Sequence, residues 1–181
     1  MVSANGYFEG PDHDISWFRI DPQFHRRHMM TLFDRIDTIL LGRRTYELFL
    51  AYWPDKIKED DEVAEFINHT KKIVVSTTMI KAPWGKWDDA TLIKDNLEER
   101  IKSLKQEQGG DIIVFGSGEI VDTLAKGDLI DEYRLIICPV ILGTGKQMIT
   151  GKYLNQKLKL KAVTSNSFGV AIIDYERDRE P

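Results

Sequence analysis

The chain lacks the features that mark secreted, membrane-spanning and nucleic-acid-binding proteins. Its 181 residues include one cysteine, Cys138, which excludes a disulfide within the chain. No stretch reaches the roughly 20 apolar residues of a membrane-spanning helix, and the N-terminus has no basic region followed by an apolar run, as a signal peptide would. A formal net charge of −4 argues against general nucleic-acid binding. We therefore expect a cytoplasmic protein with neither a membrane nor a nucleic acid as partner.

The chain also lacks internal repeats, low-complexity segments and any linker long enough to separate domains. We therefore expect a single domain over residues 1–181. The zinc-deaminase signature, His-x-Glu followed by Pro-Cys-x-x-Cys, is absent. His25 and His28 lack the cysteine or carboxylate partners of a zinc site, so no metal is predicted. Cys138 lies within an apolar run and is expected to be a core residue.

Apolar runs of strand length alternate with helical patterns along much of the chain. Asp21-Pro22 is expected to open a helix that reaches Asp34, because Asp caps helices and Pro suits their first turn. Residues 6–14 are expected to form a loop. Further strands are predicted over 37–42, 71–76, 91–94, 111–115 and 131–140, further helices over 43–52, 63–68, 95–108 and 118–126, and a hairpin over 158–165 and 170–177. The pattern predicts an α/β layered fold, mostly parallel with an antiparallel edge.

Two of these strands stop at a glycine where a helical pattern begins at once. The first junction reads Gly42-Arg43-Arg44-Thr45 and the second reads Gly116-Ser117-Gly118. Helix N-termini at strand ends collect free backbone N–H groups that bind phosphates. Arginine in a first helical turn opposes the helix dipole, which a bound anion would compensate. Alternatively, the glycines make tight turns, the arginines are solvated and Thr45 is a cap. Val121 stands where the Rossmann fingerprint has glycine or alanine, so that fingerprint is incomplete.

Two further groups of side chains have both a binding and a structural interpretation. Ser76-Thr77-Thr78 follows a predicted strand, where hydroxyl groups either bind the 2′-phosphate of NADP or cap the next turn. The N-terminal aromatic residues either close over a flat heterocycle or pack in the core. They are Tyr7, Phe8, Trp17, Phe18 and Phe24.

These motifs, taken in order, resemble those of the dihydrofolate reductase-like superfamily. The resemblance is strongest to the reductase domain of bacterial riboflavin biosynthesis and its stand-alone relatives. The segments that carry it are Ser3–Phe8 with Trp17, Leu41–Glu47, Val75–Thr77, Val114–Gly118, Leu129–Tyr133 and Cys138–Lys146.

The resemblance implies a three-layer α/β/α sandwich around a mixed, mostly parallel sheet with a C-terminal antiparallel hairpin. It implies NADPH as cofactor, with Gly42, Arg43, Arg44 and Thr45 at its phosphates. Ser76 and Thr77 would bind the adenosine 2′-phosphate. The pyrophosphate and nicotinamide would lie along Gly116, Ser117, Gly118, Glu119 and Ile120. The substrate would lie beside the nicotinamide, at Gly6, Tyr7, Trp17, Phe24 and His28.

The sequence departs from the pattern of these relatives at two points. Only Met1 and Val2 precede Ser3, where relatives have a full strand, so this strand is expected to be missing. Asn5 stands where relatives mostly have aspartate, and an amide does not exchange a proton at neutral pH. Asn5 and Asp14 are nevertheless the candidate catalytic residues, with Asp12 or a water as substitutes.

The resulting hypothesis is an NADPH-dependent reductase of a small heterocyclic substrate of pyrimidine or pterin type. It would resemble the 5-amino-6-(5-phosphoribosylamino)uracil reductase of riboflavin biosynthesis and form a homodimer. The alternatives are a dihydrofolate reductase activity or a catalytically inactive nucleotide-binding dimer.

Overall fold

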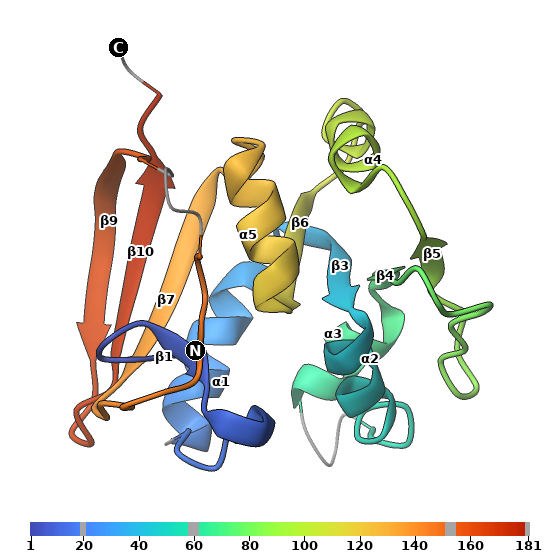
Figure 1. Ribbon diagram of the computed structural model, residues 1–181. Helices are drawn as coiled ribbons and strands as arrows, with labels where there is room; N and C mark the ends of the chain where they lie inside the picture. Colours follow the sequence, from blue (N-terminus) through green and yellow to red (C-terminus); the bar gives the residue numbers. More distant parts are fainter. Residues whose placement is uncertain (19–20, 58–61, 151–154, 180–181) are drawn as a thin grey trace. The chain divides into compact units, whose positions relative to one another are not determined.

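A computed structural model describes residues 1–18, 21–57, 62–150 and 155–179 of the chain. The chain divides into two compact units (Figure 1). The first, here called the hairpin unit, comprises Met1–Phe24 and Val121–Pro181, and the second, the parallel unit, comprises His25–Ile120. The single domain expected over 1–181 stays a prediction.

The parallel unit is built on a four-stranded sheet in the order β5-β4-β3-β6, and all neighbouring strands run parallel. In β3, the side chains of Ile39, Leu40 and Leu41 are completely buried. Such an uninterrupted apolar run is typical of a strand covered on both faces. The strands are β3 (Ile36–Gly42), β4 (Lys71–Val75), β5 (Thr91–Ile93) and β6 (Asp111–Gly116). All four follow the predicted positions to within about two residues, as is usual at element ends.

Helices precede β3 and follow β3, β5 and β6 in the chain, and their ends have local causes. Asp21 Oδ1 accepts hydrogen bonds from the backbone N–H groups of Gln23 (3.0 Å) and Phe24 (3.2 Å), which confirms the predicted cap. The helix predicted to reach residue 108 ends at Leu104 instead. The residues after Leu104 form turns with short-range hydrogen bonds instead, among them Glu107 N–H to the Leu104 carbonyl (3.2 Å). The helices are α1 (Pro22–Phe33), α2 (Arg43–Leu50), α3 (Glu62–His69) and α4 (Leu97–Leu104).

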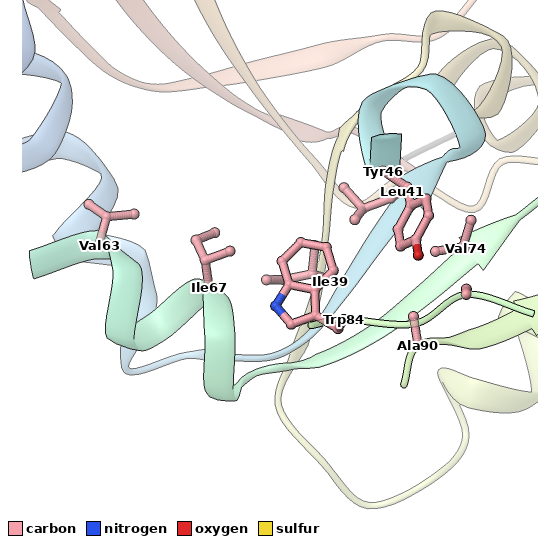
Figure 2. Packing of buried hydrophobic residues seen from close by; sticks show 9 residues of the cluster. Ile39, Leu41, Tyr46, Val63, Ile67, Val74, Trp84 and Ala90 are labelled. Carbon is pink, nitrogen blue, oxygen red and sulfur yellow. The ribbon is translucent and has the colours of Figure 1, made fainter. Parts of the chain in front are cut away.

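The core of the parallel unit is organised around Trp84, which belongs to the irregular segment between β4 and β5. Its side chain is completely buried, and its indole N–H donates to Asn68 Oδ1 at 2.9 Å. Figure 2 shows the indole among side chains from α2, α3, β3 and β4. The centres of the Trp84 and Tyr46 rings are 6.0 Å apart. A buried tryptophan needs a partner for its N–H, and Asn68 supplies it. No periodic pattern in the sequence had pointed to Trp84.

The hairpin unit contains a second four-stranded sheet, in the order β1-β7-β10-β9. Strand β10 (Ala171–Arg177) pairs antiparallel with both β9 (Leu158–Ser165) and β7 (Glu132–Cys138), and the three lie side by side in Figure 1. Helix α5 (Gly118–Lys126) begins in the parallel unit and leads into this one. The C-terminal hairpin is therefore confirmed, as is the α/β class with a parallel sheet.

The N-terminal segment differs from the sequence-based expectation. Val2 and Ser3 form a short strand, β1, which runs parallel to β7 and pairs with Ile137 and Cys138, so part of the strand expected to be missing is present. The predicted loop over 6–14 is wrong. Strand β2 (Tyr7–Glu9) pairs antiparallel with β8 (Lys146–Gln147), and a single 3₁₀ turn, η1 (Pro11–His13), follows. Strands this short leave too weak an alternation to be recognised from sequence.

Lys72, on β4, is a buried cation with a 5% exposed side chain. Its ammonium donates to the carbonyls of Asn68 (2.8 Å) and Thr70 (2.7 Å) and lies 4.8 Å from the centre of the Trp84 ring. Burial lowers the pKa of Lys72 from its ordinary value of 10.5 to about 8, although Asp88 acts in the opposite direction. Between these two pH values the unfolded chain binds more protons than the folded chain.

We predict that Lys72 makes the free energy of unfolding rise with pH between about 8 and 10.5. Urea unfolding gives the free energy of unfolding of the parent and of Lys72→Met at pH 7 and at pH 10. The difference, parent minus variant, should be about 1–3 kcal/mol larger at pH 10 than at pH 7. Lys71→Met, which removes the same charge from an exposed neighbouring position, is the control. A difference between parent and Lys72→Met that is the same at both pH values would contradict the prediction.

Candidate functional site

The carboxyl ends of three neighbouring strands meet at one edge of the parallel sheet. The register pairs Gly42 at the end of β3 with Val75 of β4, and Leu41 of β3 with Gly116 of β6. Parallel strands all end at the same edge, where open α/β sheets bind their ligands. The structure thereby brings together the segments that contain all the predicted cofactor-binding residues: Gly42, Arg43, Arg44, Thr45, Ser76, Thr77, Gly116, Ser117, Gly118, Glu119 and Ile120.

The two glycine junctions are in direct contact, although about 70 residues separate them in sequence. A Cβ atom on Gly42 would lie 2.8 Å from Ser117 Oγ and 3.1 Å from Ser117 Cβ. Gly116 has φ +140°, and a Cβ atom there would lie 3.1 Å from Thr45 Oγ1. Each turn thus occupies the space that a side chain would need in the other. A side chain at Gly42 would force Ser117 to shift, and one at Gly116 would crowd Thr45 and strain a backbone conformation that favours glycine.

The beginning of α2 has the properties of an anion site. Gly42, the residue before the helix, provides no side-chain cap, and the first turn contains no acidic residue. Its first two helical residues, Arg43 and Arg44, are both exposed. Backbone N–H groups at a helix start and guanidinium groups both favour a negatively charged ligand. The second junction starts α5, where the Ile120 N–H donates to the Ser117 carbonyl (3.1 Å).

Arg43 does not extend freely into solvent but reaches across to the segment after β4. Its Nε donates to Glu47 Oε1 at 2.7 Å, one turn further along α2, and its Nη1 donates to Thr78 Oγ1 at 2.9 Å. Thr78 was not among the predicted site residues, although it belongs to the hydroxyl-rich run 76–78 that the sequence had singled out. The sequence did not indicate that Thr78 would contact Arg43, because the two residues are 35 positions apart.

Ser76 has a structural role in the turn that follows β4. Its side chain is buried, and its hydroxyl oxygen accepts hydrogen bonds from the backbone N–H groups of Thr78 (3.3 Å) and Met79 (3.2 Å). Its own N–H donates to the Ile93 carbonyl of β5 (2.9 Å). This is the turn-capping role that the sequence had left open. Thr77, in contrast, is exposed.

Asn5, the first candidate catalytic residue, has both ends of its amide engaged. Its Oδ1 accepts from Ser3 Oγ (2.9 Å) and from the Leu142 N–H (3.1 Å), and its Nδ2 donates to the Leu142 carbonyl (2.8 Å). The amide therefore pairs with the Leu142 backbone as a neighbouring strand would. A carboxylate cannot make the same pair of bonds, because it has no donor for the Leu142 carbonyl.

Asp14, the second candidate, is exposed and accepts a hydrogen bond from the Ser16 N–H at 2.9 Å. Hydrogen bonds from the side chain and backbone of Ser16 hold the pKa of the Asp14 carboxyl below its ordinary value. Because a general acid works best with a pKa near the operating pH, this shift disfavours Asp14 as a proton donor.

Most of the predicted substrate-binding residues belong to the hairpin unit. Gly6 has φ +88°, which favours glycine, and the Trp17 indole N–H donates to the Asp14 carbonyl (3.1 Å) with the Phe18 ring edge-on at 4.5 Å. Tyr7 and Phe24 are half-buried in β2 and α1. His28, also half-buried, lies in the parallel unit. That these five residues form one substrate site stays a prediction.

Two negative findings apply to the part of the chain that the structure describes. In it, no cluster of three or more histidine, cysteine, aspartate or glutamate side chains is placed to hold a metal ion. Within the same ranges, none of the helices has the length and apolar character needed to cross a bilayer.

Comparison with known proteins identifies the family. Residues 1–173 match the family described as the RibD C-terminal domain. The chain belongs to this family. It is 30% identical over 174 residues to the uncharacterised protein YyaP of Bacillus subtilis (strain 168), covering 95% of this chain and 88% of YyaP.

Solved structures of a pyrimidine reductase-like protein and of a dihydrofolate reductase show the same fold. A pyrimidine reductase-like protein from Corynebacterium diphtheriae superposes with a TM-score of 0.70 at 14% identity, covering 99% of this chain and 90% of that one. Dihydrofolate reductase from Enterococcus faecalis, complexed with NADP(H) and RAB-propyl, gives a TM-score of 0.60 at 12% identity, covering 98% of this chain and 92% of that one. The dihydrofolate reductase-like α/β fold expected from the motifs is confirmed.

We predict that Gly42→Ala lowers the free energy of unfolding by about 1–3 kcal/mol, because the new methyl group overlaps Ser117. Ser117→Gly in the same chain should recover part of the loss, a coupling that a double-mutant cycle measures. Gly143→Ala is the matched control, since a Cβ atom there meets nothing within 4 Å. Equal losses from Gly42→Ala with and without Ser117→Gly would show that the two turns do not press on each other.

We predict that Asn5→Asp is less stable at neutral pH than the parent by about 1 kcal/mol, because it places a carboxylate oxygen against the Leu142 carbonyl. Asn5→Ala should lose a similar amount. Urea unfolding measures both, with Asn155→Ala, at an exposed position, as the control. An Asn5→Asp variant as stable as the parent would rule out the amide pairing.

Proposed function

We propose that the protein is an NADPH-dependent reductase of a small heterocyclic substrate of pyrimidine or pterin type. One observation carries this proposal: the carboxyl ends of β3, β4 and β6 meet at the start of α2, which has no side-chain cap. Membership of the RibD C-terminal domain family supports it.

The residues at this edge fit the phosphates of a dinucleotide. The start of α2 offers backbone N–H groups, Thr45 and the guanidinium of Arg44 to the pyrophosphate. Gly116 and Gly118 lack side chains, so the backbone of the second junction can approach the ligand closely. In our proposal Ser117, Glu119 and Ile120 continue this surface toward the nicotinamide.

The segment after β4 is proposed to hold the adenosine end. Thr77 is exposed there, while the Ser76 hydroxyl oxygen accepts hydrogen bonds from two backbone N–H groups of the turn. The hydrogen bond from Arg43 to Thr78 places a positive charge beside the same segment. When bound, NADPH supplies the hydride, and the protein contributes binding and orientation. The relative from Enterococcus faecalis is itself complexed with NADP(H), which agrees with this choice of cofactor.

The substrate class is proposed from the family and from the Corynebacterium diphtheriae relative, a pyrimidine reductase-like protein. The uracil reductase step of riboflavin synthesis is the model reaction, and Gly6, Tyr7, Trp17, Phe24 and His28 are the proposed contacts. A homodimeric state and a cytoplasmic location are part of the same proposal.

One observation favours a second candidate, a nucleotide-binding protein without reductase activity. Asn5 is fully engaged with Ser3 and Leu142, and the Asp14 pKa is lowered, so neither is suited to donate a proton. The two candidates differ in turnover alone. Oxidation of NADPH, followed at 340 nm with pyrimidines and pterins as substrates, distinguishes them, and methotrexate binding would indicate the folate activity instead.

We predict that the protein binds NADPH more tightly than NADH, as measured by calorimetric titration. Arg44→Ala should weaken NADPH binding about 10- to 150-fold, because a hydrogen bond from a charged group is typically worth about 1.5–3 kcal/mol. Arg100→Ala, which removes an exposed arginine from α4, is the control and should bind as the parent does. Unchanged NADPH affinity in Arg44→Ala would contradict this role for Arg44, and no binding of either nucleotide to the parent would contradict the proposed function.

A further inference from the structure

Asn5 and Gly6 form the only Asn-Gly pair in the sequence. Asparagine is a chemically labile residue, and its side chain reacts fastest before glycine, which has no side chain to hinder attack by its backbone nitrogen. Both residues are exposed in the turn between β1 and β2, so water reaches them. The turn therefore contains the two groups that spontaneous deamidation requires.

Deamidation of this pair proceeds through a cyclic imide. The backbone nitrogen of Gly6 attacks the side-chain carbonyl carbon of Asn5, and a bond between these two atoms forms. The bond from that carbon to Nδ2 breaks, and the proton from the Gly6 nitrogen passes through water to the departing amide nitrogen, which leaves as ammonia. One water molecule then opens the imide and gives aspartate or isoaspartate, depending on which carbonyl carbon it attacks.

In the folded chain, hydrogen bonds hold both reacting groups. The Gly6 N–H donates to the Ser3 carbonyl at 3.0 Å. Asn5 Oδ1 accepts from Ser3 Oγ (2.9 Å) and from the Leu142 N–H (3.1 Å), and Nδ2 donates to the Leu142 carbonyl (2.8 Å). The Asn5 side chain must turn toward the Gly6 nitrogen before it reacts, so these bonds must break first.

Further bonds hold the turn itself. The Gly6 carbonyl accepts from the Met148 N–H (3.3 Å), and the Tyr7 N–H donates to Ser3 Oγ (2.9 Å). The buried Ser3 hydroxyl thus binds Asn5 and Tyr7 at once. A reaction that proceeds only from an opened state is slowed in proportion to the rarity of that state.

We propose that Asn5 is a deamidation site that its contacts with Ser3 and Leu142 protect, and that it reacts only in molecules whose β1–β2 turn has opened locally. The product cannot form the same contacts again, because a carboxylate has no donor for the Leu142 carbonyl. Isoaspartate in addition lengthens the main chain between β1 and β2. Local opening of the turn is thereby made irreversible. The proposal does not depend on the proposed function.

The first test compares the folded parent with a synthetic peptide of residues 1–12 at the same pH and temperature. Peptide mapping by mass spectrometry follows the conversion of Asn5, and water labelled with heavy oxygen identifies the product of imide hydrolysis. Asn5 should react at least about tenfold more slowly in the folded chain than in the peptide. Equal rates in the two would overturn the proposal.

The second test weakens the turn. Ser3→Ala, which removes the hydrogen bonds to Asn5 and from Tyr7, should speed the reaction of the folded chain about 5- to 30-fold. The peptide with the same substitution should react as the parent peptide does. Ser165→Ala, the same change at an exposed position of β9, is the matched control and should react at the parent's rate.

A destabilised variant of the parallel unit separates local opening from unfolding of the whole chain. Gly42→Ala, which crowds Ser117, should leave the deamidation rate of Asn5 within about twofold of that of the parent. An acceleration equal to that in Ser3→Ala would mean that unfolding of the whole chain exposes Asn5, and an unchanged rate in Ser3→Ala would mean that the Ser3 contacts do not protect it. Either result overturns the proposal and leaves the proposed function untouched.

Discussion

The close approach of the two glycine junctions is the constraint on which the candidate site depends. Gly42 lies against Ser117, and Gly116 lies against Thr45, so a side chain at either glycine would crowd the other junction. The parallel pairing of β3 with β6 brings them to this distance, and the buried apolar run of β3 holds the pairing in place. Two helix beginnings thus lie close together at the carboxyl ends of the strands.

The core below the sheet edge fixes the helix that carries the arginines. Tyr46, three residues after Arg43, is buried, packs near Trp84 and donates its hydroxyl proton to the Pro83 carbonyl. Trp84 is in turn hydrogen-bonded to Asn68, whose amide N–H groups donate to the carbonyls of Trp53 (2.8 Å) and Lys56 (3.2 Å). Through these contacts the buried Tyr46 anchors the first turns of α2, where Arg43 lies. Buried polar networks that are fully hydrogen-bonded give this kind of rigidity.

The hairpin unit shows how a polar side chain at a motif position can have a structural role. Asn5 pairs with both backbone groups of Leu142, and the Ser3 hydroxyl donates to Asn5 Oδ1 and accepts from the Tyr7 N–H (2.9 Å). These bonds connect β1, the start of β2 and the segment after β7. An aspartate would lose one of them, so the amide here is explained by what it binds within the protein.

The sequence by itself determined the strands of the parallel sheet, the cap of α1 at Asp21 and the C-terminal hairpin, because these depend on local periodicity and on neighbours within a few residues. It also indicated that the segments after β3, β4 and β6 belong together. Only the tertiary structure decided that Ser76 caps a turn, that Thr78 contacts Arg43 and that Trp84 fills the core. A hydroxyl or an indole can hydrogen-bond with many partners, and the partner it meets is set by strand pairing between residues far apart in the chain.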